Sequence, residues 1–369
     1  MKKVLFAAES VYQLFNAIIL RMTEKENDEC DLILSEATVW PSDIISNLKG
    51  IHLFDKIVFP ETKKQEWDFW DLDQEKRYEV YRNPKAFFSC GYPVEPVYDE
   101  LFFPIDHIFW KMIYNYEVSN GRVPDIYMYD EGVRAYTMEL SKTDDKPFSK
   151  DAYNPSFVNS IKAYYLHQPQ LYSLTEYPYE LKKIQNPTNN EKLRQAIQAV
   201  YGFESAPNEK YIYMEDFFFA DHLIGNDFDL FKKITQIIGK DNIIVKRHPR
   251  DKFDRFTPWG VNTMQKNVIP WEVQLLLNDY SEKVLVSVSS TSILTPFLIF
   301  ESNQHVIMLD KLFVGDNPTH SDRGYNKFIY NTLNWVNEKK DFIHRPSTLE
   351  ELEEVLHYID LDIFIQKNE

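Results

Sequence analysis

Short apolar runs alternate with helix-like patterns along this chain, and that alternation limits the fold more than any other feature. Near the N-terminus, apolar runs at 4–8 and 31–35 are followed by helical patterns at 12–20 and 43–48. Further strands in this half are predicted at 57–59 and 125–129. A strand that is followed at short spacing by a helix is typical of a parallel, doubly wound sheet. We therefore predict an α/β protein.

The same alternation begins again after a polar, proline-containing stretch near residues 186–210. Strands are predicted at 211–214, 242–246, 284–288 and 305–309, and helices at 230–238, 271–277, 293–300 and 348–359. A chain of 369 residues exceeds what one hydrophobic core usually organises. The sequence therefore predicts two Rossmann-like domains that face a central cleft, residues 1–190 and 210–369, joined by a linker at 191–209.

Charge and composition restrict the partners of this chain. It carries 41 Lys and Arg residues against 57 Asp and Glu residues, which gives a net charge of −16. This balance disfavours nucleic acid as a partner, because neutralising phosphates requires a basic footprint. The same balance disfavours an anionic membrane as the main docking surface. Aromatic residues make up 15% of the chain, which either a large core or a sugar-stacking surface would explain.

No metal site and no membrane segment are predicted. Cys30 and Cys90 are the two cysteines, and no Cys/His spacing typical of a zinc site occurs. Asp-x-Asp sequences at 227–229 and 360–362 lie in helix regions rather than at a nucleotide-sugar site. The apolar run at 4–8 is too short for a signal peptide, and no run reaches transmembrane length. We expect a soluble, cytoplasmic protein.

The strongest motif is the segment VKRHPR at 245–250, which follows a predicted strand. In open α/β sheets, ligands bind beyond the carboxyl ends of strands. His248, with Lys246 and Arg250 beside it, suits a phosphate-bearing ligand, and Pro249 restricts His248 to an extended backbone. A solvated basic turn is the structural alternative.

A second motif, SVSSTS at 287–292, also stands between a strand and a helix. Hydroxyl groups and backbone N–H groups at a helix N-terminus bind anions without a net charge. Ser289, Ser290 and Thr291 are therefore candidate ligands of a phosphate. Helix capping is the structural alternative, although one cap accounts for only one hydroxyl group.

The third motif is Asp130-Glu131-Gly132, directly after the strand at 125–129. Two neighbouring carboxyl groups at a strand end can raise each other's pKa, and this produces a general base. Gly132 permits a tight turn or a close approach to a ligand. An ordinary turn would also use Asp and Gly.

Taken in order, these motifs resemble those of bacterial sialyltransferases. Those enzymes carry an acidic-acidic-glycine motif, then a His-Pro motif and then a Ser/Thr-rich motif, which here read DEG, HP and SSTS. The N-terminal ESVYQLFNAI and the segment IIVKRHPR resemble glycosyltransferase family 52, which includes lipooligosaccharide and capsule sialyltransferases. The resemblance follows most of the chain in motif order.

The resemblance implies a GT-B fold, with a CMP-sialic acid donor in the C-terminal domain and a glycan acceptor in the N-terminal domain. It implies that His248 is the acid at the donor phosphate and that Glu131 is the base. Ser289, Ser290 and Thr291 fall near the same phosphate. In family 52 an aspartate nearer to the His-Pro motif is the alternative base, and this points to Asp216, Asp221 and Asp227.

The expected reaction moves sialic acid from CMP-sialic acid to a galactose-containing glycan of a bacterial capsule or lipooligosaccharide. CMP is a good leaving group, so a histidine and hydroxyl groups can stabilise its phosphate without a metal cofactor. We expect a single inverting displacement, with domain closure that excludes water.

Other functions stay open at this point. The chain could use another nucleotide-activated donor, act as a CDP-polyol phosphotransferase of wall polymers, or bind glycans without catalysis, because fold alone does not define function. No GxGxxG or Walker A sequence occurs, so a nicotinamide, flavin or P-loop enzyme is unsupported. A homodimer, and peripheral association with the inner face of the cell membrane, are also open.

Overall fold

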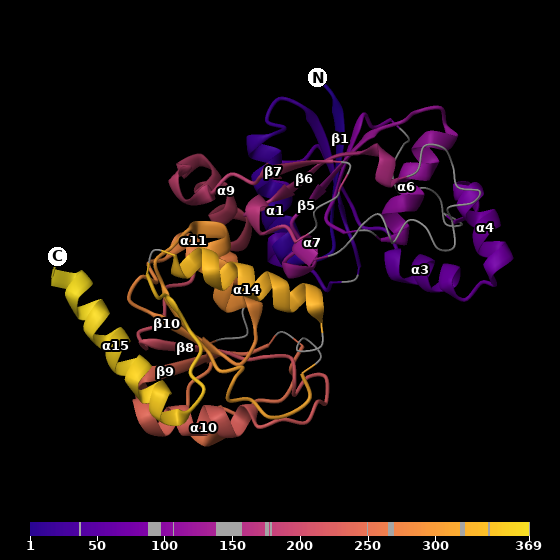
Figure 1. Ribbon diagram of the computed structural model, residues 1–369. Helices are drawn as coiled ribbons and strands as arrows, with labels where there is room; N and C mark the ends of the chain where they lie inside the picture. Colours follow the sequence, from indigo (N-terminus) through magenta and orange to yellow (C-terminus); the bar gives the residue numbers. More distant parts are fainter. Residues whose placement is uncertain are drawn as a thin grey trace. The chain divides into compact units, whose positions relative to one another are not determined.

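The protein consists of two compact units, unit 1 (Met1–Gly202) and unit 2 (Phe203–Glu369). A computed structural model describes residues 1–36, 38–87, 97–105, 107–137, 157–173, 177, 179–248, 250–264, 269–317, 322–338 and 340–368 (Figure 1). The change from one unit to the next falls within the segment expected as a linker. Helix α9 (Glu191–Tyr201) in that segment belongs to unit 1, where its buried side packs on helices α1 (Val11–Thr23) and α2 (Ser42–Gly50).

Unit 1 is built on a seven-stranded parallel sheet with the order β3-β2-β1-β4-β5-β6-β7. Its strands are β1 (Lys3–Ala8), β2 (Glu29–Leu34), β3 (Lys56–Val58), β4 (Glu100–Phe103), β5 (Asp125–Tyr129), β6 (Ile161–Leu166) and β7 (Glu180–Lys183). The strand order reverses between β1 and β4, and such a reversal opens a crevice at the carboxyl ends of the strands.

The central strands of unit 1 are buried on both faces, which explains their continuous apolar sequences. Residues Val4–Ala8 of β1 have no exposed surface, and Phe6 stacks on Phe102 of β4 with ring centroids 4.5 Å apart. The other described helices of unit 1 are α3 (Thr62–Trp70), α4 (Gln74–Arg82), α5 (Pro84–Phe87), α6 (Ile108–Ser119) and α7 (Val133–Thr137).

Unit 2 contains a five-stranded parallel sheet with the order β12-β11-β10-β8-β9. Its strands are β8 (Tyr211–Met214), β9 (Ile243–Lys246), β10 (Val284–Ser287), β11 (His305–Met308) and β12 (Ile343–His344). Here the order reverses between β8 and β10. Each unit therefore has the doubly wound topology that the alternating pattern predicts.

Helices cover both faces of the sheet in unit 2 (Figure 1). They are α10 (Asp227–Ile238), α11 (Trp271–Leu277), α12 (Thr295–Phe300), α14 (Arg323–Asn337) and α15 (Leu349–Asn368). Helices α10 and α15 share one core with β8, β9, β10 and β11, while α11 and α14 lie on the opposite side of the strands.

Helix α15 continues beyond its predicted end at residue 359. Its buried stripe extends through Ile359 to Ile363, and Asp362 accepts a hydrogen bond from His305 Nε2 at 2.9 Å. This helix is therefore fixed to the sheet along its second half as well as its first. No helix in the described ranges is long and apolar enough to cross a membrane.

Candidate functional site

All three sequence motifs lie where parallel strands end. Asp130 and Glu131 follow β5 in unit 1, His248 follows β9 in unit 2, and Ser289 follows β10. In unit 2, Glu215 and Asp216 follow β8, which lies between β9 and β10. The strand order thus brings the His-Pro segment, these two acids and the serine-rich segment to one edge of the second sheet.

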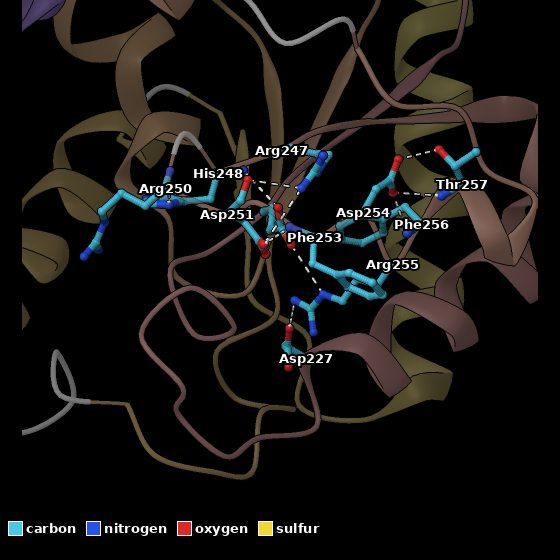
Figure 2. A network of polar contacts seen from close by, with 11 residues as sticks. Asp227, Arg247, His248, Arg250, Asp251, Phe253, Asp254, Arg255, Phe256 and Thr257 are labelled. Carbon is cyan, nitrogen blue, oxygen red and sulfur yellow. Dashed lines mark hydrogen bonds and ion pairs between the residues drawn. The ribbon is translucent and has the colours of Figure 1, made fainter. Parts of the chain in front are cut away.

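The imidazole of His248 has a defined tautomer. The backbone N–H of Arg250 donates to its Nδ1 at 3.3 Å, so the ring proton of neutral His248 is on Nε2. Burial, with the nearby charge of Arg250, lowers the pKa of His248 below its ordinary value. Nε2 has no hydrogen-bond partner among the described residues, and its N–H is available to a ligand. Figure 2 shows this turn and the network behind it; Pro249 lies outside the described residues.

The basic side chains of the same segment differ in their surroundings. Arg250 is exposed and donates through Nη1 to Asp221 Oδ1 at 2.6 Å. Lys246, at the end of β9, is half-buried, and burial lowers its pKa while the charges of Glu272 and Glu204 oppose that shift. Lys246 therefore lies in partly desolvated surroundings in unit 2, whereas Arg250 reaches the surface.

The serine-rich segment encloses the carboxylate of Asp216. Oδ2 accepts hydrogen bonds from the Ser287 hydroxyl (2.8 Å) and the Val288 N–H (3.1 Å). Oδ1 accepts from the N–H (3.1 Å) and hydroxyl (3.0 Å) of Ser289. Asp216 is 4% exposed, and burial raises its pKa to about 6. The Ser289 hydroxyl therefore donates to an internal carboxylate and not to a phosphate ligand as predicted.

Ser290 and Thr291 lie closer to the surface than Ser289. Both are half-buried, and the Ser290 hydroxyl pairs with the hydroxyl of Ser292 at 2.7 Å. The helix expected after this segment begins instead with a 3-10 turn, Thr291–Leu294, before α12. Of the three predicted hydroxyl ligands, these two are the ones within reach of a ligand at the sheet edge.

The three aspartates named as alternative bases are all engaged. Asp216 accepts the four hydrogen bonds given above, Asp221 pairs with Arg250, and Asp227 pairs with Arg255. A general base needs a lone pair that is free to accept the proton of a substrate. The structure gives each of these carboxylates a different, structural partner.

In unit 1, Asp130 is a hub of hydrogen bonds. It is 1% exposed, and its carboxylate accepts hydrogen bonds from Tyr12 (3.0 Å), Tyr136 (2.6 Å), the Gly132 N–H (2.8 Å) and the His167 N–H (3.3 Å). These contacts join α1, α7 and the end of β6 to the turn after β5. The carboxylate of Asp130 is fully used within the fold.

Glu131 is the contrasting member of this pair. Its side chain is 9% exposed, and burial raises its pKa to about 7, with Arg134 opposing that shift and Asp130 and Glu9 adding to it. Oε1 accepts no hydrogen bond from any described residue and lies 3.8 Å from Arg134 Nε. Gly132 follows with φ +111°, a backbone conformation that disfavours other residues. Glu131 therefore combines a pKa near neutrality with a buried oxygen that accepts no hydrogen bond from the described residues.

A second acidic group near Glu131 was not found from the sequence. Glu9, directly after β1, lies 3.7 Å from His107 Nδ1, and His107 Nε2 lies 2.9 Å from Glu66. Burial raises the pKa of Glu9, and Glu66 adds to that shift. The position of Glu9 at the end of a predicted strand could have indicated this group. His107 gave no such indication, because it follows β4, which was not predicted as a strand.

A group of three or more His, Cys, Asp or Glu side chains arranged to hold a metal ion does not occur within the described ranges. The cations near the candidate sites are side chains of the chain itself: Lys246, Arg247, Arg250 and Arg255 in unit 2 and Arg134 in unit 1.

Comparison with known proteins identifies the fold. No protein-family model and no curated protein sequence matches this chain. Its structure is similar to that of an α/β-galactoside α-2,3-sialyltransferase from the luminous marine bacterium Photobacterium phosphoreum (TM-score 0.52, 12% identity, covering 93% of this chain and 98% of that one). It is also similar to UGT2 from Phytolacca americana (TM-score 0.50, 8% identity, covering 96% and 90%). The chain therefore has a GT-B type fold of two Rossmann-like α/β domains, like that of a bacterial sialyltransferase.

Proposed function

We propose that this chain is a glycosyltransferase that moves sialic acid from CMP-sialic acid to a glycan, with a galactoside of a bacterial capsule or lipooligosaccharide as the acceptor. The observation that carries the proposal is the neutral His248, which offers Nε2–H at the carboxyl edge of the second sheet. The GT-B fold and the sialyltransferase-like order of the motifs support the same function.

Donor binding is assigned to unit 2. When CMP leaves, negative charge grows on its phosphate, and a fixed hydrogen-bond donor stabilises that charge. Nε2–H of His248 supplies such a donor, and the hydroxyl groups of Ser290 and Thr291 supply two more at the same edge. A bound phosphate also raises the pKa of the imidazole, because an adjacent negative charge favours the protonated ring. His248 then becomes able to give a proton to the leaving group.

Acceptor activation is assigned to unit 1. The acceptor hydroxyl oxygen forms a bond to the anomeric carbon of sialic acid while the bond from that carbon to the phosphate oxygen breaks. The hydroxyl proton passes to Glu131, and CMP leaves with its new charge held by His248. Glu131 suits this role because its pKa of about 7 allows it to accept a proton at neutral pH. One such displacement inverts the anomeric configuration and requires no metal.

The test is the nucleotide that stabilises the protein. A ligand at 100 times its Kd raises the unfolding free energy by about 2.7 kcal/mol. We expect CMP to raise the melting temperature more than UDP or CDP, and transfer from CMP-sialic acid to persist in EDTA. Stabilisation by UDP would favour a different sugar donor, and stabilisation by CDP would favour a polyol phosphotransferase. Loss of transfer in EDTA with recovery in Mg²⁺ or Mn²⁺ would contradict the metal-independent mechanism.

A further inference from the structure

Behind the His248 turn lies a network of charged side chains that the proposed chemistry does not use (Figure 2). Its members are Glu215, Asp227, Arg247, Asp251 and Arg255. Glu215 and Asp251 are each 3% exposed, and Asp227 is 7% exposed. Three acids and two guanidinium groups thus share one desolvated space, where each proton and each hydrogen bond has a large effect on the local structure.

Glu215 joins the ends of two neighbouring strands. Its Oε2 accepts a hydrogen bond from the backbone N–H of His248 at 2.9 Å. Its Oε1 accepts one from Arg255 Nε at 3.4 Å, and Arg255 also pairs with Asp227. The His248 carbonyl in turn accepts from the Asp251 N–H at 3.0 Å. The backbone of His248 is therefore held on its N–H side by Glu215 and on its carbonyl side by Asp251.

Asp251 has one satisfied and one unsatisfied oxygen. Oδ1 accepts a hydrogen bond from the Phe253 N–H at 2.9 Å and lies 3.8 Å from Arg247 Nη2. Oδ2 is buried and accepts no hydrogen bond from any residue in the described part of the chain. The Asp251 side chain acts on the carboxyl group of Glu215 and raises the pKa of that group. Two ionised carboxylates are acceptors only, so they can bond to each other only if one of them carries a proton.

We propose that Glu215 and Asp251 share one proton when the donor binds, and that this acid pair is the positioning element that directs His248 Nε2 toward the donor phosphate. The inference rests on the proposed function for the role of His248. Glu215 acts through His248 and does not touch the donor, so it is a positioning residue.

The electrostatic surroundings are consistent with a retained proton. Burial raises the pKa of Glu215 to about 7; the His248 N–H and Arg255 oppose this shift, and Asp251 adds to it. The charged groups that act on the pair and on His248 are Asp221, Asp227, Arg247, Arg250 and Arg255. Above neutral pH the pair loses its proton, and two adjacent buried carboxylates repel each other. The turn that they hold should then loosen.

The decisive measurement is the affinity for CMP between pH 5.5 and 8.5, by calorimetry on the full chain. For the wild type we expect affinity to fall above pH 7, approaching tenfold for each pH unit, as one proton is lost. Glu215→Gln should keep the affinity and lose this pH dependence, because the amide accepts from His248 and donates to Asp251. Glu215→Ala should bind at least about tenfold more weakly at every pH, since one hydrogen bond to a charged group contributes about 1.5–3 kcal/mol. The CMP phosphate also ionises near pH 6, but this affects the wild type and the variants equally and does not change the comparison between them.

Glu353→Gln is the matched control, because it removes an exposed carboxylate of unit 2, on α15. It should follow the wild type. If wild type and Glu215→Gln show the same pH dependence of CMP affinity, or if Glu215→Ala binds normally, the acid pair has no positioning role.

A second measurement, without any nucleotide, separates this inference from the proposed function. A carboxyl group with a raised pKa stabilises the fold below its ordinary pKa, and that stability is lost as pH rises through about 7. The melting temperature of Glu215→Gln relative to wild type should therefore increase between pH 5 and pH 8. A difference that does not change with pH overturns the shared proton. A growing difference in a protein that binds no CMP at any pH supports the acid pair and overturns the proposed donor.

Discussion

At the residue scale, hydrogen bonding separates the acids that hold the fold from the groups that can react. Asp130 and Asp216 each accept four hydrogen bonds and are almost fully buried. Glu131 follows Asp130 in sequence but keeps one oxygen without a bond from any described residue. His248 shows the same contrast within one side chain, because Nδ1 accepts a hydrogen bond while Nε2 is available to a ligand. When the neighbouring group is fully hydrogen-bonded, it holds the reactive group in place, and the atoms of the reactive group stay available to a substrate.

The first prediction concerns His248. His248→Ala should fold normally, because the side chain is only half-buried, and should lose most transfer. Losing one donor to a developing anion typically lowers kcat by about 10²–10³, or about 2.7–4 kcal/mol. Steady-state turnover of CMP-sialic acid measures this effect. His357→Ala, at an exposed position of the same unit, is the control. Near wild-type turnover by His248→Ala would contradict the assignment.

The second prediction concerns Glu131. Glu131→Gln should lose transfer while CMP affinity stays unchanged, because CMP binds to unit 2. The base acts when ionised, so wild-type kcat/KM should fall as pH drops below about 7, the pKa to which burial raises this group. Glu61→Gln removes an exposed carboxylate of unit 1 and should change neither quantity. If Glu131→Gln transfers normally, the base lies elsewhere, and the same assay applies to Asp216→Asn, Asp221→Asn and Asp227→Asn.

At the scale of elements, the sequence predicts best the strands that are buried on both faces. Strands β5 and β8 and helix α11 have the predicted bounds, because their apolar runs end abruptly at polar or turn residues. Strand β7 was missed because it is the edge of its sheet, and its sequence, ELKK, is largely exposed. Helix α14 was missed because only a narrow stripe of it is buried, and the rest of its surface is polar.

The sequence predicts that the candidate site residues lie at strand ends, but it does not predict which partners their side chains take. A parallel sheet brings the carboxyl ends of its strands together, so the motifs could be placed at a sheet edge from sequence alone. Which partner a side chain takes depends on contacts between distant segments. Ser289 donates to an aspartate that lies 73 residues earlier in the chain, and no local pattern indicates that pairing.

The third prediction concerns the hydrogen bonds that join the segment after β8 to the segment after β10. Asp216→Ala should destabilise the protein, because it removes the acceptor of several buried donors in the serine-rich segment. One buried donor left unsatisfied costs about 1–3 kcal/mol, so we expect a loss of at least that size in urea unfolding. The effect should grow toward low pH, because burial raises the pKa of Asp216 to about 6, so the folded wild type takes up a proton before the unfolded chain does and gains stability relative to the variant. Unchanged stability would show that the hydrogen bonds to Asp216 contribute little.

At the scale of the whole molecule, the charged and polar groups at the two sheet edges suit different ligands in unit 1 and unit 2. The net charge is −16, yet the proposed donor carries a phosphate and a carboxylate. A long-range field of this sign repels such a ligand, so binding must depend on short-range contacts. In unit 2 the groups proposed for those contacts are the cations of the His-Pro segment and uncharged donors, namely His248 Nε2–H and hydroxyl groups. Unit 1 offers mainly carboxyl groups at its sheet edge, which suit the hydroxyl groups of a sugar.

The last prediction tests this assignment of ligands to the two units by hydrogen exchange on the full chain. Saturating CMP should slow amide exchange in peptides that span 247–256 and 287–294, because a bound phosphate stabilises the closed form of both turns. At 100 times Kd the linkage energy is about 2.7 kcal/mol, which slows exchange through local opening by up to about 100-fold. Peptides that cover 125–137 of unit 1 should exchange at unchanged rates. His248→Ala should lose the protection in unit 2, and this loss ties the effect to the proposed phosphate contact. Protection confined to unit 1 would mean that the nucleotide binds to the first sheet, and the assignment of donor and acceptor halves would be reversed.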